Sequence, residues 1–114
     1  MGIFGKPNIG KMKEKGDVKG LIKALKDKDP DVSGRAKSAL IEMGQTSVEP
    51  LEKALGDKDS DVRRGAAVTL GKIGDPGAVE PLEKALRDKG PYVRKVAKAA
   101  LEKICRGIEG KGRR

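Results

Sequence analysis

The chain has 114 residues, of which 38% are charged and 2% are aromatic, and its formal net charge is +9 at pH 7. This length suits one domain with a modest, aliphatic core. The sequence has no histidine, which removes the commonest general base and metal ligand, and its single cysteine, Cys105, excludes an internal disulfide. We expect a cytoplasmic protein, since no apolar run approaches the ~20 residues of a membrane span and the N-terminus lacks the apolar core of a signal peptide.

The first segment, residues 1–16, is basic and contains a stretch that imitates a nucleotide-binding motif. GKPNIGK at residues 5–11 has the glycine and lysine spacing of a phosphate-binding loop. A working loop needs a Ser or Thr hydroxyl for magnesium after its lysine, and Met12 stands there instead. Too few residues precede the stretch for the buried strand that the motif requires. We therefore predict a flexible basic leader over residues 1–16, with residues 1–8 disordered and with no nucleotide binding.

After the leader, one unit occurs three times, at spacings of 30 and then 31 residues. The copies are clearest in LKDKDPDV at residues 25–32, LGDKDSDV at 55–62 and LRDKGPYV at 86–93. The motif VEPLEKAL also occurs twice, at residues 48–55 and 79–86. Agreement over so many positions indicates three copies of one structural unit.

Each unit has the pattern of two helices. Apolar residues of the first helix recur with the spacing of one helical face, as at Val18, Leu21, Ile22 and Leu25. The second helix begins at Asp29-Pro30, where a carboxylate N-cap precedes a proline at the first helical position. Gly44 and Gly74 follow the second helices, where a left-handed residue would end them. We predict helices over about 17–26, 30–43, 47–56, 60–73, 78–87 and 91–106.

A unit of two helices buries only one face, so three units must stack on one another. The predicted fold is therefore all-α, a right-handed α-solenoid of three two-helix repeats. The repeats span about 17–46, 47–77 and 78–105, and a basic C-terminal tail follows over residues 106–114.

The sequence DSDVRRGAAVTLGKIG at residues 59–74 resembles the HEAT-like repeat named after phycobilisome (PBS) lyases. The resemblance covers roughly residues 17–105. Two departures are Ser33, where the other copies have arginine, and Cys105, where they have glycine. The resemblance implies a non-catalytic scaffold that binds a protein partner, with the second helices lining the concave side of the solenoid.

Aspartates at alternate positions before the second helices imitate a calcium loop. They are Asp27, Asp29 and Asp31 in the first copy and Asp57, Asp59 and Asp61 in the second. An EF-hand loop also needs glycine at its sixth position and glutamate at its twelfth. Both sixth positions are valine, and the twelfth are Ser38 and Val68. We interpret these aspartates as helix caps and predict no metal site.

Cys105 is the one candidate for a catalytic residue, and the sequence has no histidine to act as its base. We interpret Cys105 as an ordinary residue near a helix end. The sequence therefore predicts no catalytic residue and no cofactor, and the chain is not expected to be an enzyme.

Several cations are predicted to lie on the side of the second helices that points away from the core, here called the outer face. The resemblance places this face on the concave side of the solenoid. On the middle one, Arg64, Ala67, Val68 and Lys72 should point away from the core. Stepping by the repeat spacing adds cations before and after it, and the predicted concave patch consists of Lys37, Arg64, Lys95, Lys98 and Lys103. An ordinary solvated helix face would have the same residues.

We expect this patch to receive an acidic segment of a protein partner, and we expect the chain to be a monomer. Two alternatives remain. One is binding of a nucleic-acid backbone through the basic tails and the last helix. The other is a bilin-lyase-like enzyme component, as the family name suggests.

Overall fold

A computed structural model describes residues 7–112, with side chains described for residues 7–109. This part of the chain is helical and contains no strand. Its elements are α1 (Ile9–Glu14), α2 (Val18–Ala24), α3 (Pro30–Met43), α4 (Gln45–Ala54), α5 (Ser60–Ile73), the short 3-10 helix η2 (Pro76–Ala78), α6 (Val79–Ala85) and α7 (Pro91–Gly112).

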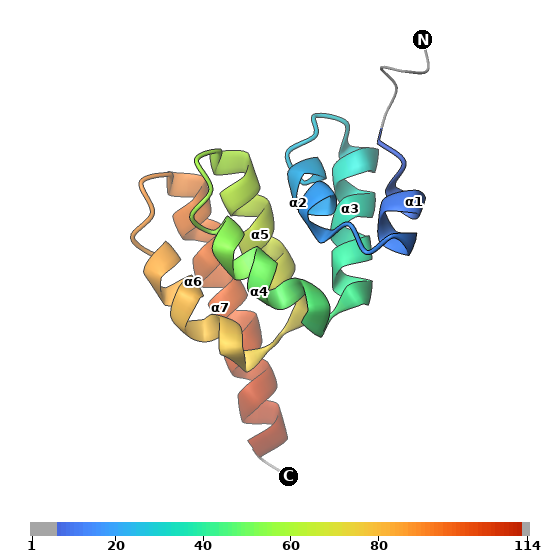
Figure 1. Cartoon of the computed structure of the whole chain (residues 1–114). Coiled ribbons are helices and arrows are strands. Elements are labelled where there is room, and N and C mark those ends of the chain that lie inside the picture. The colour runs from blue at the N-terminus through green and yellow to red at the C-terminus, as the bar shows by residue number, and fades with distance from the viewer. Residues whose placement is uncertain (1–6, 113–114) are drawn as a thin grey trace.

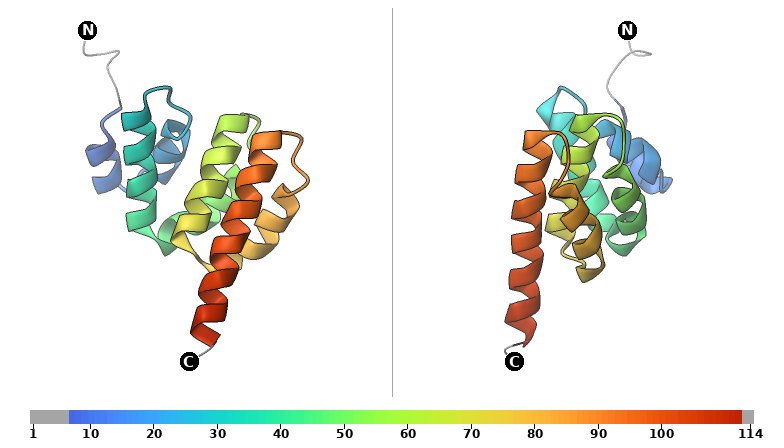
Figure 2. Two further views of the ribbon diagram at one scale, coloured as in Figure 1. Left: turned by 180° about the vertical axis from the view of Figure 1, so that it is seen from behind. Right: turned by 90° about the vertical axis from the view of Figure 1, so that its left-hand side faces the viewer.

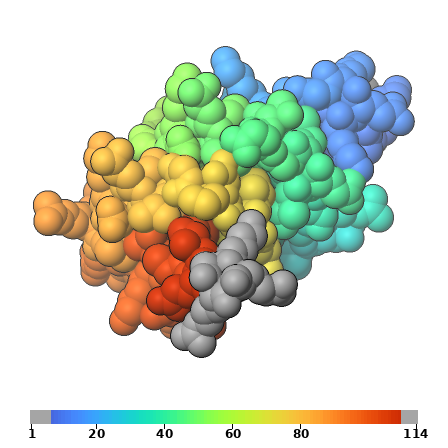
Figure 3. Space-filling model, turned by 90° about the horizontal axis from the view of Figure 1, so that it is seen from below, coloured from blue at the N-terminus to red at the C-terminus, as the bar shows by residue number. Residues whose placement is uncertain are grey.

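The helices form two layers, as Figures 1 and 2 show. The first helices of the repeats, α2, α4 and α6, lie in one layer, and the second helices, α3, α5 and α7, lie in the other. Seen from below, the repeats follow one another across the molecule in chain order (Figure 3). The molecule extends over 53 × 33 × 20 Å. The predicted all-α solenoid of three helical pairs is therefore confirmed.

Aspartate side chains cap the second helices, as predicted. Asp29 accepts the backbone N–H of Asp31 at 2.9 Å, and Asp59 accepts that of Asp61 at 2.8 Å. This backbone hydrogen bond is the main reason why the pKa of Asp59 is lower than usual. The N–H two positions later is also accepted by Asp27, Asp57 and Asp88. The carboxylates thus satisfy N–H groups at the helix starts, where no intrahelical acceptor exists.

Glycines end the second helices of the first two repeats. Gly44 has φ 58° and Gly74 has φ 79°, values that favour glycine because it has no Cβ. Gly44 is the only residue between α3 and α4, so the chain reverses within a single residue. Ser47, which is fully buried, supports this turn because its hydroxyl lies 2.8 Å from the Leu40 carbonyl and 2.9 Å from that of Gly44.

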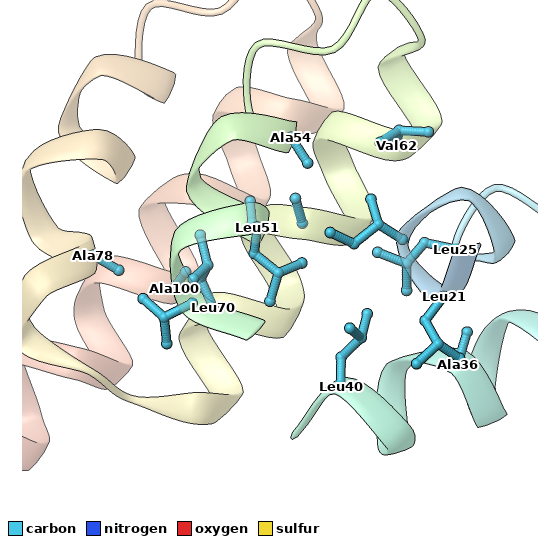
Figure 4. Close-up of a cluster of buried hydrophobic side chains, with 14 of the residues drawn as sticks. Leu21, Leu25, Ala36, Leu40, Leu51, Ala54, Val62, Leu70, Ala78 and Ala100 are labelled. Atoms are coloured by element: carbon cyan, nitrogen blue, oxygen red, sulfur yellow. The ribbon is translucent and has the colours of Figure 1, made fainter. Parts of the chain in front are cut away.

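The core is a ladder of leucines at equivalent positions (Figure 4). The fully buried members are Leu21, Leu51 and Leu82 on the first helices and Leu40 and Leu70 on the second. Leu101, the counterpart of Leu70 on α7, is half-buried, because no described element covers that side of α7. One continuous core therefore joins all three repeats.

The N-terminal region differs from the prediction. Helix α1 packs against α2 and α3, buries Ile9 to 7% exposure, and forms an ion pair from Lys13 to Glu42. The flexible leader predicted over residues 1–16 thus contains a packed helix that covers the first repeat. Residues 1–6 lie outside the described part of the chain, and so does most of the segment predicted to be disordered.

The C-terminal region also differs from the prediction. Helix α7 continues to Gly112, so residues 106–112 of the predicted tail are helical, and residues 113–114 lie outside the described part. The physical reason is the missing glycine. Cys105 stands where Gly44 and Gly74 adopt positive φ, and nothing stops the helix there.

Candidate functional site

Arg63 links the second and third repeats and is buried although it is charged. Its Nε and Nη2 donate to the carboxylate of Asp88 at 2.9 and 3.1 Å, and its Nη1 donates to the carbonyls of Asp57 and Lys58 at 2.8 and 3.2 Å. The two charged side chains are 6% and 9% exposed. Burial tends to raise the pKa of Asp88, but the bonds from Arg63 and from the Gly90 N–H outweigh it and lower that pKa. The pair therefore joins loops of two repeats.

The equivalent position differs in the other repeats. In the first repeat it is Ser33, whose hydroxyl donates to the Pro30 carbonyl at 3.4 Å within the same turn. In the third repeat it is Arg94, which is exposed and donates from Nη1 to the Asp88 carbonyl at 2.7 Å. Among the described residues, therefore, no arginine on α3 joins the first repeat to the second.

The helix contacts show the same asymmetry. A Cβ added to Gly71 on α5 would lie 2.7 Å from the Cβ of Ala100 on α7, so the two helices touch at this point. Ala67, one turn earlier, is fully buried. The equivalent residues on α3 are Lys37 and Ile41, which are larger. Helix α5 consequently packs more closely on α7 than on α3.

This packing corrects one prediction about the outer face. We expected Ala67 to point away from the core, but it is fully buried. The sequence pattern predicts that α5 is buried along one stripe only. In the structure α5 lies between α3 and α7, the second helices of the neighbouring repeats (Figure 2). Arg64 and Lys72 are exposed as expected, and Val68 is half-buried.

The five cations of the predicted patch differ in their exposure and in their ion pairs. Arg64, Lys95, Lys98 and Lys103 are exposed, and Lys37 is half-buried. Arg64 also lies 3.6 Å from the Asp61 carboxylate on its own helix. None of the other four has an ion pair with a described side chain.

The repeat register separates these cations into two groups. Arg64 and Lys95 are equivalent positions on α5 and α7, and so are Lys72 and Lys103. These four residues form two rows on the outer face of α5 and α7. Lys72 is the residue that the predicted patch omitted, and its spacing of eight residues from Arg64 was the available signal.

The other two predicted residues lie on helix flanks instead. Lys37 and Lys98 are equivalent to Ala67, whose flank of α5 is buried against α7. Lys37 therefore lies on the side of α3 that faces α5, and Lys98 lies on the side of α7 that faces away from the second repeat. The outer face of α3 carries Ser38 and Glu42, so the basic rows do not continue onto it.

No cluster of three or more Cys, Asp or Glu residues in the described part of the chain could hold a metal ion. Cys105 is exposed near the end of α7. Within residues 7–112, no helix is both long and apolar enough to cross a membrane.

Comparison with known proteins identifies the repeat. The sequence profile of HEAT repeats matches residues 18–102, which covers three quarters of the chain and all three helical pairs. No curated protein matches the sequence. The profile match, with which the stacked helical pairs agree, shows that this chain belongs to the HEAT repeat family.

Proposed function

We propose that this chain is a non-catalytic scaffold that binds an acidic segment of a partner protein across the outer face of α5 and α7. HEAT repeats are generally protein-interaction scaffolds. The observation that carries the proposal is the pair of basic rows, Arg64 with Lys95 and Lys72 with Lys103. They lie on two helices in direct contact at Gly71 and Ala100.

The electrostatics of this face favour an anionic partner. Three of the four side chains have no carboxylate partner among the described residues, so an incoming carboxylate need not displace an existing ion pair. Charges placed in this way accelerate association and select partners more than they add affinity, and salt weakens their effect. Lys98 at the open edge and Lys37 at the α3 side would extend the basic surface at its borders.

Other parts of the proposal rest on the sequence. The motif at residues 59–74 supports the PBS-lyase-like type of HEAT repeat. A monomer is favoured because a net charge of +9 opposes association of identical chains. A cytoplasmic location agrees with the single, unpaired cysteine.

The test reverses three charges of the outer face with Arg64→Glu, Lys95→Glu and Lys103→Glu in one variant. The matched control changes net charge equally at three equivalent loop positions, Lys28→Glu, Lys58→Glu and Lys89→Glu, all of which are exposed. The two proteins are used as affinity baits in parallel with the wild type, and captured proteins are identified by mass spectrometry. Helix content and melting temperature are measured for each.

We expect the control to retain the acidic partners captured by the wild type and the outer-face variant to lose them, with melting temperatures nearly unchanged. Equal capture by all three proteins would refute the proposed face. Capture that falls equally in both variants would mean that net charge, and not this face, attracts the partner. Capture that disappears after nuclease treatment would instead support binding to nucleic acid.

A further inference from the structure

The layer of first helices contains two grooves at equivalent places in the repeat. One lies between α2 and α4, has a volume of about 350 Å³, and is lined by Lys19, Ile22, Lys23, Pro50, Lys53, Ala54 and Asp57. The other lies between α4 and α6 and has a volume of about 500 Å³. It is lined by Glu49, Glu52, Lys53, Leu55, Gly56, Glu80, Pro81, Lys84, Ala85 and Asp88.

Each of the seven residues that line the first groove has a counterpart in the lining of the second, at the repeat spacings of 30 and 31. The second wall of each groove has the same four residue types, Pro, Lys, Ala and Asp, and the first wall of each has one equivalent lysine. Two of these seven pairs differ in residue type, and Leu55, Gly56 and Glu80 line the second groove alone. Lys19 and Ile22 of the first groove are replaced by Glu49 and Glu52 in the second. The first groove is consequently basic with an apolar floor, whereas the second carries additional carboxylates.

The first groove combines features of a peptide-binding site. Ile22 and Ala54, each 8% exposed, and the half-buried Pro50 form an apolar strip between the helices. Lys19 and Lys23 stand on one wall and Lys53 on the other, all exposed. No described carboxylate forms an ion pair with any of these three lysines. The carboxylate of Asp57 already accepts the N–H of Asp59 at 2.8 Å.

The second groove is less suited to an anion because Glu49, Glu52 and Glu80 are among the residues that line it. Burial, followed by the charges of Asp75 and Glu49, also raises the pKa of Glu52. An acidic ligand that fits the first groove should therefore be rejected by the second. The second groove is thus a negative control for acidic-peptide binding within the same chain.

We propose that the α2–α4 groove binds an acidic peptide segment of a partner protein. One apolar side chain of that segment would lie on Ile22, Pro50 and Ala54, and carboxylates on both sides of it would face the three lysines. The volume suits one or two large side chains and is at the lower end for a binding pocket. Charge complementarity favours this occupant over a second copy, because the chain itself has a net charge of +9.

This site lies on the opposite layer from the basic rows of α5 and α7 (Figure 2), so it is separate from the proposed function. The two sites also differ in chemistry. The outer face offers cations alone, whereas the groove requires an apolar anchor as well as carboxylates. A leucine-dependent interaction would therefore identify the groove.

The experiment uses a fluorescein-labelled synthetic peptide in which one leucine has two glutamates on each side. Binding to the full chain is measured by fluorescence anisotropy and mapped by amide chemical shifts. We expect shifts centred on Lys19, Ile22 and Ala54. Replacing the peptide's leucine by alanine, or its glutamates by glutamines, should weaken binding about tenfold, which is the effect of 1.4 kcal/mol.

Charge reversal locates the site on the protein. Lys19→Glu should weaken binding about tenfold at low salt, whereas Lys89→Glu, a matched reversal in the exposed loop before α7, should leave it unchanged. The double variant Glu49→Lys and Glu52→Ile, which gives the second groove the residue types of the first at both positions, should add amide shifts at Lys84 and Ala85. Melting temperatures verify that each variant is folded.

Three results would overturn the proposal. They are equal binding of the leucine and alanine peptides, equal loss of binding in Lys89→Glu and Lys19→Glu, and an absence of binding to the wild type at low salt. Tighter binding of a single-stranded oligonucleotide at the same residues would also contradict it and would assign the lysines to a nucleic-acid backbone. Loss of partner capture by the outer-face variant is a different measurement, so either site can fail alone.

Discussion

The Arg63 guanidinium is the most buried positive charge among the described side chains, and its position explains how two repeats hold together. It satisfies two backbone carbonyls of its own repeat and both carboxylate oxygens of Asp88 in the next one. Replacing one partner of such a pair leaves the other charge buried without compensation. This cost, and not the net strength of the pair, determines the effect of a mutation.

We expect Arg63→Ala to lower the free energy of unfolding by about 3 kcal/mol, since it leaves the Asp88 carboxylate buried and unpaired. Arg94→Ala removes the equivalent arginine of the third repeat, which is exposed, and should change stability by less than about 1 kcal/mol. Urea denaturation of both variants measures the difference. Equal losses would mean that the joint contributes nothing beyond the local bond to a loop carbonyl.

The same joint predicts a dependence of stability on pH. The pKa of Asp88 is lowered in the folded chain relative to about 3.9 for a free aspartate. Its contribution is therefore complete above pH ~4 and is lost as the pH falls through the lower, folded pKa. The difference in unfolding free energy between wild type and Asp88→Asn should be constant from pH 7 to 5 and shrink at lower pH. A difference that grows on acidification would contradict this assignment.

At the scale of elements, small residues determine how closely neighbouring second helices approach. Gly71 allows α5 to touch Ala100, whereas Ile41 takes the equivalent place on α3. Glycine normally weakens a helix by up to about 1 kcal/mol relative to alanine. The loss at Gly71 is offset by the contact that only glycine permits.

We expect Gly71→Ala to destabilise the protein by about 1–3 kcal/mol, because its Cβ would lie 2.8 Å from the Cα of Ala100 and the backbone must shift. Gly34→Ala is the matched control within α3, where an added Cβ meets nothing within 4 Å, and it should stabilise by up to about 1 kcal/mol. Thermal or urea unfolding gives both values. A stabilising Gly71→Ala would show that α5 and α7 are not in contact there.

At the scale of the whole molecule, the two joints between repeats are unequal. The second has the Arg63–Asp88 pair and the close contact at Gly71. The first has Ser33 and Ile41 at those positions, although Leu25 packs against Gly65 and the leucine core continues through it. Helix α1 covers the outer side of the first repeat. The stability of a repeat array depends on such interfaces between neighbours.

We therefore predict that the first repeat opens at lower free energy than the other two. Native-state hydrogen exchange should show lower protection for amides of α2 and α3 than for those of α5 and the first half of α7. Ser33→Arg, which restores the arginine of the other copies, should raise protection in α3 by pairing with Asp57. Uniform protection along the chain would mean that the three repeats unfold as one unit.

The sequence by itself determined the repeat, the helical pairs and the leucine core, because these depend on local periodicity and capping residues that recur at fixed spacing. Asp29 and Asp59 marked helix starts that the structure has at the same residues. Local patterns also gave the exposed positions of Arg64, Lys95, Lys98 and Lys103, since most of the charged residues of a helix face solvent.

Only the tertiary structure decided which flank of each helix is covered. Ala67 was predicted to face outward, but α7 packs against it. Ile9 was predicted to lie in a flexible leader, but it is buried where α1 packs on the first repeat. The two grooves could not be predicted from the sequence either. Lys19 and Lys53 line opposite walls of one groove because α2 and α4 lie side by side in the folded chain. Hydrophobic periodicity along the sequence shows only the face that each helix buries against the other helix of its own repeat. Contacts between repeats depend on the angle and distance of stacking, which small and large residues such as Gly71 and Ile41 determine together.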